Sequence, residues 1–150
     1  MLHRFLPPPV VVLVLAAMMW LGRDLGGLAM TFDGQLWLSL LLAATGLTLM
    51  LAAAWTLGRA RTTIDPTRPE KSKVLVTTGI YRYSRNPIYL GDLLLLLAWA
   101  VYLGNPLNLV PALAFVPLMN RFQIRPEEQV LARHIPSDYL TYRKRTRRWL

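Results

Sequence analysis

The chain alternates between long uncharged stretches and short, strongly basic ones. From Gln35 to Leu57 no side chain is ionisable and most positions are apolar. As a helix, Leu36–Leu57 would span about 33 Å at roughly 1.5 Å per residue, enough to cross the hydrocarbon core of a bilayer. This stretch therefore predicts a transmembrane helix.

Three further apolar segments predict helices of the same kind: Phe5–Gly22, Ile88–Leu103 and Leu107–Phe122. The last two flank Gly104-Asn105-Pro106, which has the composition of a tight turn, so together they predict a helical hairpin. Both are near or below the usual minimum of about 17 residues for a spanning helix. They must either recruit flanking residues or lie partly shielded by protein.

The first apolar segment has a second interpretation. Met-Leu-His-Arg before an apolar run resembles the start of a signal peptide. No small-x-small cleavage site follows Gly22, so a retained helix is favoured.

The composition indicates a membrane protein rather than a soluble one. Of 150 residues, 54% are hydrophobic and 17% charged, with a mean hydropathy of +0.35, whereas soluble domains average about 45–50% apolar and about 25% charged. The absence of cysteine excludes disulfides, cysteine-ligated metals and thiol catalysis, and with 2 histidines no metal site is expected. We predict an all-α, polytopic integral membrane protein, with about four transmembrane helices, a C-terminal helical hairpin and a cytoplasmic helical tail.

The basic residues predict the orientation. There are 17 Lys+Arg against 8 Asp+Glu, a formal charge of +9; seven basic residues fall between Arg59 and Arg85 and eight between Arg121 and Arg148. An even number of predicted spans separates these two groups, so the positive-inside rule places both on the cytoplasmic side. Arg4 places the N-terminus there too, so both termini are predicted to be cytoplasmic.

A nucleic-acid partner is the alternative explanation of this charge. The basic tract Arg143-Lys144-Arg145 with Arg147-Arg148, together with Tyr139, Tyr142 and Trp149, resembles an arginine-rich binding arm. Topology and attraction to anionic lipid headgroups already account for basic residues beside membrane spans. We therefore expect anionic lipid headgroups, and no nucleic acid, as partners; the pattern predicts no particular oligomeric state.

Two polar segments hold the candidate chemistry, one on each side of the predicted hairpin. The first runs from Thr77 to Gly91, and the second starts at Arg125 and continues to Arg143. Because a hairpin returns the chain to the same membrane face, Arg85-Asn86-Pro87 and Glu127-Glu128 should lie close together.

Taken singly, these residues also have ordinary structural interpretations. Pro126 suits the first position of a helix, where Glu127 and Glu128 would each stabilise the N-terminal end by a few tenths to about 1 kcal/mol. The tyrosines of the first segment could be interfacial aromatics. Asp92 is harder to explain, because a carboxylate inside an apolar span is costly and usually functional. The alternative to a functional role is a position close enough to the membrane interface for water to hydrate the carboxylate.

In combination, the residues resemble a known family. The matching pieces are Gly79-x-Tyr81, Arg85-Asn86-Pro87-x-Tyr89-x-Gly91, Asn105-Pro106, Arg125 before Glu127-Glu128, and Asp138-Tyr139-Leu140-x-Tyr142-x-Lys144-Arg145. Their order and spacing are similar to the isoprenylcysteine carboxyl methyltransferase family and to the broader membrane phospholipid methyltransferases. The resemblance covers about Leu75–Leu150, half of the chain.

The resemblance implies a membrane enzyme that methylates a lipid or lipid-linked acceptor at the cytoplasmic face with S-adenosylmethionine. Residues 1–150 would form one membrane domain, with N-terminal helices in 1–58 and a methyltransferase-like, cofactor-binding half in 75–150. The implied cofactor pocket comprises Gly79, Tyr81, Asn86, Pro87, Tyr89, Glu127, Glu128, Tyr139 and Tyr142. We expect catalytic roles for Arg85, Tyr89 and Glu128, and acceptor binding by Arg85 and Asp92.

Two departures from the family pattern matter. Asn86 stands where the family has His, and an amide cannot shuttle a proton near neutral pH. A mechanism that needs a base there is disfavoured, and a carboxylate acceptor would not need one. Ile135-Pro136 replaces Phe-Gly, and Ser137 is the predicted N-cap of the last helix.

Two other functions stay open from the sequence. One is a nicotinamide-dependent reductase of the sterol type, which shares the Arg-His-Pro-x-Tyr and late Glu elements but is usually larger. The other is a non-catalytic membrane lipid-binding subunit on the same scaffold, to which Asn86 gives some weight.

Overall fold

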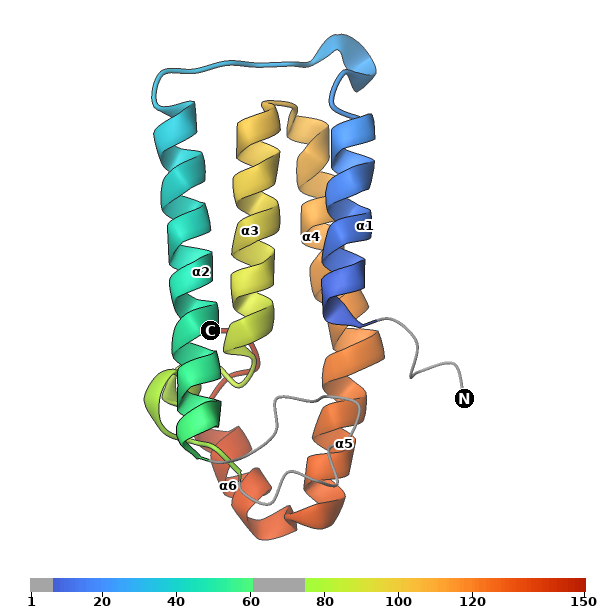
Figure 1. Cartoon of the computed structure of the whole chain (residues 1–150). Coiled ribbons are helices and arrows are strands. Elements are labelled where there is room, and N and C mark those ends of the chain that lie inside the picture. Colours follow the sequence, from blue (N-terminus) through green and yellow to red (C-terminus); the bar gives the residue numbers. More distant parts are fainter. Residues whose placement is uncertain (1–6, 61–74) are drawn as a thin grey trace.

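The computed structural model describes residues 7–60 and 75–150, which form helices, turns and loops without any strand (Figure 1). The start of the predicted span Phe5–Gly22 and the basic residues between 61 and 74 lie outside these ranges. Within them, the predicted all-α class is confirmed.

Four helices stand side by side: α1 (Pro8–Leu21), α2 (Gln35–Arg59), α3 (Pro87–Leu103) and α4 (Leu109–Met119) (Figure 1). Two shorter helices, α5 (Arg125–His134) and α6 (Pro136–Arg145), lie at one end of this bundle. In the described part of the chain, α2 is the one helix long and apolar enough to cross a membrane, and α1 and α3 are apolar but shorter. Within the described residues all four predicted apolar segments form helices, while the number of spans remains a prediction.

The contact between α2 and α3 depends on two glycines. A Cβ atom added at Gly46 would lie 2.8 Å from the Gly91 carbonyl oxygen, and one at Gly91 would lie 2.7 Å from the Gly46 carbonyl oxygen. No side chain fits at such distances, so the two backbones approach closely only because both positions are glycine. Nearby, the Ser39 hydroxyl donates to the Ala98 carbonyl at 2.9 Å.

The core lies between α1, α3 and α4. Met19, Leu96 and Phe115 come from these three helices and are at most 1% exposed. The Trp99 indole donates to the Ala16 carbonyl at 3.1 Å, which adds a polar tie between α3 and α1. α3 is thereby held on both sides, by α1 and α4 and by α2.

The predicted hairpin turn is present at the end of the bundle opposite α5 and α6. Gly104 adopts the left-handed conformation (φ 70°) that ends α3, and a 3-10 turn, Pro106–Asn108, leads into α4. The Asn105 amide donates to the carbonyls of Arg23 and Leu25, each at 2.9 Å. The turn is therefore tied to the loop between α1 and α2.

The chain stays helical from α4 into α5. A π-helical turn, Asn120–Ile124, joins them, and Ile124 has helical angles (φ −66°, ψ −47°). Pro126 has no N–H to offer the carbonyl four residues earlier, and a π turn relieves that mismatch. Pro126, Glu127 and Glu128 do lie in the first turn of α5, as predicted, but the π turn before them continues the helix, so the glutamates do not face a free N-terminal end.

The last helix begins two residues earlier than predicted. Pro136 is the first residue of α6 and Ile135 occupies the N-cap position. The Ser137 hydroxyl bonds instead to the Asp138 carboxylate at 3.3 Å. The prediction of Ser137 as N-cap is wrong, because the fixed φ of proline starts the helix before the serine is reached.

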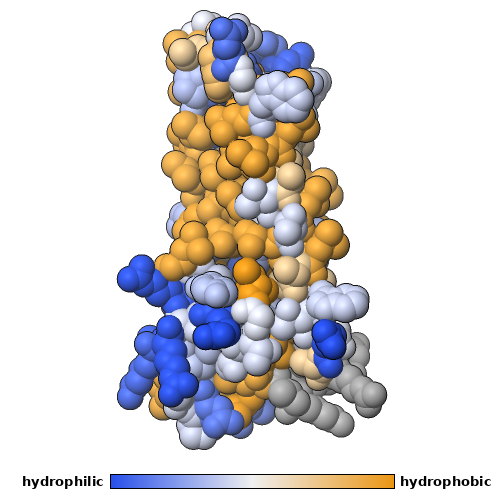
Figure 2. All heavy atoms as spheres, turned by 90° about the vertical axis from the view of Figure 1, so that its left-hand side faces the viewer, coloured by the Kyte–Doolittle hydropathy of each residue, from blue (hydrophilic) through white to orange (hydrophobic). Residues whose placement is uncertain are grey.

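The outer side of α2 is strongly apolar. Figure 2 shows an apolar band along this face between two polar ends. Leu51 is 70% exposed and Trp55 is 69% exposed. Contiguous apolar surface of this extent is unusual on soluble monomers and typical of an interaction with lipid or protein.

Candidate functional site

The first polar segment forms a loop against the end of α2 before α3 begins. Gly79 has φ +59°, and a Cβ there would lie 2.9 Å from the Thr56 hydroxyl oxygen of α2. A 3-10 turn, Gly79–Arg82, follows and buries Tyr81. Gly79 thus sets the loop close to α2, and Pro87, fully buried, starts α3 at the end of the loop.

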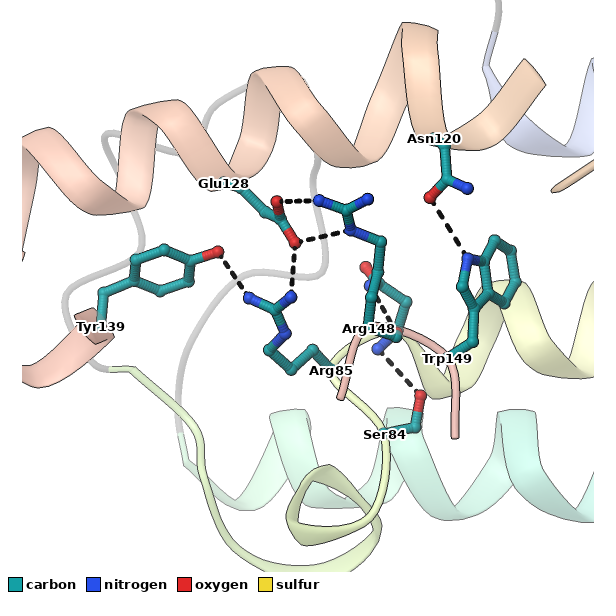
Figure 3. Close-up of polar contacts among 8 residues, drawn as sticks. Ser84, Arg85, Asn120, Glu128, Tyr139, Arg148 and Trp149 are labelled. Atoms are coloured by element: carbon teal, nitrogen blue, oxygen red, sulfur yellow. Dashed lines mark hydrogen bonds and ion pairs between the residues drawn. The ribbon is translucent and has the colours of Figure 1, made fainter. Parts of the chain in front are cut away.

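Two arginines converge on the carboxylate of Glu128 (Figure 3). Arg85 Nη2 lies 3.0 Å from Glu128 Oε1. Arg148 forms a fork, with Nε 3.0 Å from Oε1 and Nη2 2.7 Å from Oε2. Arg85 Nη1 also donates to the Tyr139 hydroxyl at 2.9 Å. These contacts join the loop before α3, helices α5 and α6, and the C-terminal tail.

Glu127 is placed differently from its neighbour. Its Oε1 accepts a hydrogen bond from the Tyr89 hydroxyl at 2.9 Å, and no described cation forms an ion pair with it. Burial raises the pKa of Glu127 to about 7; the Tyr89 hydrogen bond opposes the rise and the charge of Glu128 adds to it. Of the two glutamates, Glu127 is therefore the one whose charge is not already compensated.

Asn86 is bound to the tail as well as to its own loop. Its backbone N–H donates to the Ser84 hydroxyl at 3.1 Å, and its side-chain amide donates to the Arg148 carbonyl at 2.9 Å. The amide oxygen of Asn86 makes no hydrogen bond to a described residue, so it keeps an acceptor available.

Tyr139 and Tyr142 lie on one face of α6 and are both buried against the loop. The Tyr142 hydroxyl donates to the Tyr81 carbonyl at 2.7 Å. Burial raises the pKa values of Tyr142, Tyr139 and Tyr81, so all three stay neutral hydroxyl groups.

The structure thus brings together most of the predicted residues at one end of the bundle. We use the term polar cluster for Arg85, Asn86, Tyr89, Glu127, Glu128, Tyr139 and Arg148. The predicted proximity of the Arg-Asn-Pro stretch and the glutamate pair is confirmed. Asp92 is an exception: it is 7% exposed on α3 and makes no hydrogen bond or ion pair with a described residue.

Three members of the site were not predicted from the sequence: Arg148, and the pair Trp149 and Asn120, in which the indole donates to the amide oxygen at 3.2 Å. Arg148 and Trp149 belong to the basic tract assigned to lipid headgroups. The sequence did contain a sign of this contact: an arginine next to a tryptophan follows the last helix, and two adjacent glutamates elsewhere in the chain need a cationic partner.

The donor set fits a ligand such as S-adenosylmethionine. Its ammonium and ribose hydroxyls need acceptors, and its carboxylate needs cationic or N–H donors. Two acceptors are available. Glu127 accepts one hydrogen bond, from the Tyr89 hydroxyl, and the Asn86 amide oxygen accepts none from a described residue. On the donor side, the buried Arg85 Nε atom has no hydrogen-bond partner among the described residues. Arg148 Nη1 likewise forms no hydrogen bond or ion pair with a described residue.

Fold and site together define the class: an apolar helical bundle that carries a charged, hydrogen-bonded site at one end. A family model described as phospholipid methyltransferase matches residues 34–137, more than half of the chain. The chain belongs to the phospholipid methyltransferase family. No solved structure gives a significant match to it.

Known proteins similar in sequence to this chain include methyltransferases. An uncharacterised protein of Haemophilus influenzae is 41% identical over 63 residues, which cover 42% of this chain and 100% of that one. The protein-S-isoprenylcysteine O-methyltransferase of Saccharomyces cerevisiae is 34% identical over 96 residues, 62% of this chain and 39% of that one. The protein-S-isoprenylcysteine O-methyltransferase A of Arabidopsis thaliana is 35% identical over 106 residues, 69% of this chain and 52% of that one.

These matches confirm the resemblance to isoprenylcysteine methyltransferases. The chain spans about half or less of the length of the two methyltransferases named.

Proposed function

We propose that this protein is a membrane methyltransferase that transfers a methyl group from S-adenosylmethionine to a lipid or lipid-linked acceptor. The observation that carries the proposal is the polar cluster: residues of a methyltransferase-like motif, far apart in sequence, form one hydrogen-bonded site in a chain of the phospholipid methyltransferase family.

The membrane placement rests on the apolar surface. The exposed apolar face of α2 and the apolar α1 and α3 suit surroundings of lipid. We propose four spans, with both termini and the polar cluster on the cytoplasmic side. Most basic residues lie in the segment before α3 and in the segment after α4, and the positive-inside rule places such segments in the cytoplasm. The same basic residues would attract anionic lipid headgroups.

The cofactor would be held by residues from both polar segments. Glu127 offers a carboxylate to an ammonium group or ribose hydroxyls, and Asn86 offers its amide oxygen. Gly79, Tyr81 and Pro87 shape the loop beside them, while Tyr89, Glu128, Tyr139 and Tyr142 complete the pocket. When bound, S-adenosylmethionine supplies an electrophilic methyl group on a positively charged sulfur.

The residues of the site act chiefly by alignment and water exclusion. Methyl transfer is an in-line displacement, so a nucleophile held at the correct distance and angle gains most of the rate enhancement. Arg85 would orient an anionic acceptor, at the cost of sharing its guanidinium with Glu128, and Asp92 would contact the acceptor from inside the bundle. Tyr89 and Glu128 would fix the geometry of the reacting groups. Asn86 cannot serve as a base, which suits an acceptor that needs no deprotonation.

Ligand binding tests the proposal. S-adenosylmethionine or S-adenosylhomocysteine should raise the thermal unfolding temperature of the detergent-purified protein by mass action, and reduced nicotinamide dinucleotide should not. A shift with the nicotinamide alone would overturn the proposal in favour of a reductase. Binding of neither would favour a non-catalytic subunit. Transfer of label from methyl-labelled donor to fractionated membrane lipids would then identify the acceptor.

A further inference from the structure

The tail after α6 returns into the polar cluster. The Arg85 backbone N–H donates to the Arg147 carbonyl at 3.0 Å, and the Asn86 amide donates to the Arg148 carbonyl at 2.9 Å. The Thr146 hydroxyl donates to the Arg82 carbonyl at 3.3 Å. The tail is therefore fastened to the loop before α3, although it lies beyond residues 34–137, which the family model matches.

Arg148 and Arg85 share one carboxylate but differ in what they leave available. Arg85 uses both Nη atoms, on Glu128 and Tyr139, and its side chain is 9% exposed. Arg148 uses Nε and Nη2 on Glu128, its side chain is 29% exposed, and its Nη1 has no described partner. Arg148 is thus the guanidinium of the polar cluster with an accessible, unused donor (Figure 3).

The local charge favours an anion at that donor. Two guanidinium groups face the single carboxylate of Glu128, which leaves an excess of one positive charge in a partly buried place. The hydrogen bonds to Glu128 raise the pKa of Arg148 further, so its charge is permanent. Glu127, the residue before Glu128 on α5, has a raised pKa and forms no ion pair with a described cation, so its carboxylate takes on its full negative charge when a cation binds beside it. A group that carries both a carboxylate and an ammonium complements this pair of charges.

We propose that Arg148 is a cofactor-binding and positioning residue: it fixes the Glu128 carboxylate and donates its Nη1 to the carboxylate of the methionine part of S-adenosylmethionine. This inference rests on the proposed function. It predicts that the tail contributes to cofactor affinity through the amino acid part of the ligand and not through its adenosine part.

Two probes separate these parts. S-adenosylhomocysteine carries the amino acid group, whereas 5′-methylthioadenosine keeps the adenosine and thioether and lacks both the carboxylate and the ammonium. Affinities for both are measured by isothermal titration calorimetry on the detergent-purified full chain. The variants are Arg148→Ala, Arg148→Lys and, as matched control, Arg145→Ala, which removes the same charge from an exposed side chain without a described partner.

Arg148→Ala should weaken S-adenosylhomocysteine binding by about tenfold or more, because a charge-assisted hydrogen bond is lost. Its affinity for 5′-methylthioadenosine should change less than about twofold. Arg148→Lys, which keeps the charge without the fork, should show a smaller but equally selective loss and covers the case in which Arg148→Ala does not fold. Arg145→Ala should bind both ligands as the unmodified protein does.

Other outcomes would overturn the inference. Equal weakening of both ligands would make Arg148 a merely structural residue, and unchanged affinity for both would leave its Nη1 without a role in cofactor binding. If the unmodified protein bound neither ligand, the proposed function itself would fail, which is a different result from a failure confined to the variants.

Discussion

The unequal surroundings of Glu127 and Glu128 predict that the same substitution will have different effects at adjacent positions. Glu128→Gln removes the negative charge that faces Arg85 and Arg148 at 2.7–3.0 Å. Glu127→Gln leaves an amide oxygen that still accepts the hydrogen bond from Tyr89. The two variants differ by one position and are otherwise chemically identical.

The magnitude follows from the burial of the groups. Breaking a buried ion pair by removing one partner costs about 3–5 kcal/mol, because the remaining charge is left uncompensated. The Arg85 side chain is 9% exposed, but those of Glu128 and Arg148 are 16% and 29% exposed, so water screens part of the effect. We therefore expect Glu128→Gln to cost about 3 kcal/mol, and Glu127→Gln less than about 1 kcal/mol.

Thermal unfolding of the detergent-purified variants at pH 8, followed by circular dichroism, measures the difference. For a chain of this size, about 3 kcal/mol corresponds to a decrease of roughly 6–12 °C in unfolding temperature. Glu128→Gln should remain folded at room temperature and lose methyl transfer. Equal decreases in the two variants would refute the assignment of Glu128 as the charge-compensated hub of the polar cluster.

Two further predictions concern pH and packing. The pKa of Glu127 is raised from 4.5 to about 7 in the folded protein. Between pH 4.5 and about pH 7 the folded state therefore keeps a proton on Glu127 that the unfolded state has lost. The free energy of unfolding should fall as the pH rises through this range. The difference in unfolding temperature between pH 5.5 and pH 8 should shrink in Glu127→Gln; an identical difference would contradict the raised pKa. Gly46→Leu should separate α2 from α3 and cost about 2 kcal/mol or more, because its Cβ would meet the Gly91 carbonyl oxygen at 2.8 Å. Gly58→Leu is the control, since a Cβ there has no neighbour within 4 Å, and equal cost at both sites would refute the packing argument.

The helices and the meeting of the two polar segments could be predicted from local patterns. Apolar runs between basic clusters predicted the helices. The hairpin turn at Gly104-Asn105-Pro106 predicted that Arg85-Asn86-Pro87 and Glu127-Glu128 lie close together, and Arg85 Nη2 lies 3.0 Å from Glu128 Oε1. These features depend on the order of elements along the chain, and such order is visible in the sequence.

The partners of individual side chains could not be predicted in the same way. Arg148 lies 20 positions from Glu128, and its contact depends on the path of the tail after α6. The positive-inside rule alone explains a basic tract beside a membrane span. The charge pattern therefore does not distinguish Arg148 from the other basic residues of the tract. Pro126 lies in the first turn of α5, as its helix-start interpretation predicts, but the local sequence does not show that a π turn joins this helix to α4.

The π turn at Asn120–Ile124 has a consequence for the direction in which the glutamates point. Successive residues of an α-helix are turned by about 100° about its axis, so a single residue gained or lost upstream rotates everything that follows by that angle. The π turn thus determines which side chains of α5 face the loop before α3 and the tail. A return of this turn to α geometry with all its residues kept would rotate Glu127 away from Tyr89 and Glu128 away from the two arginines, without altering a single residue of the polar cluster. The site is therefore encoded by spacing in the helix as much as by the residues that compose it.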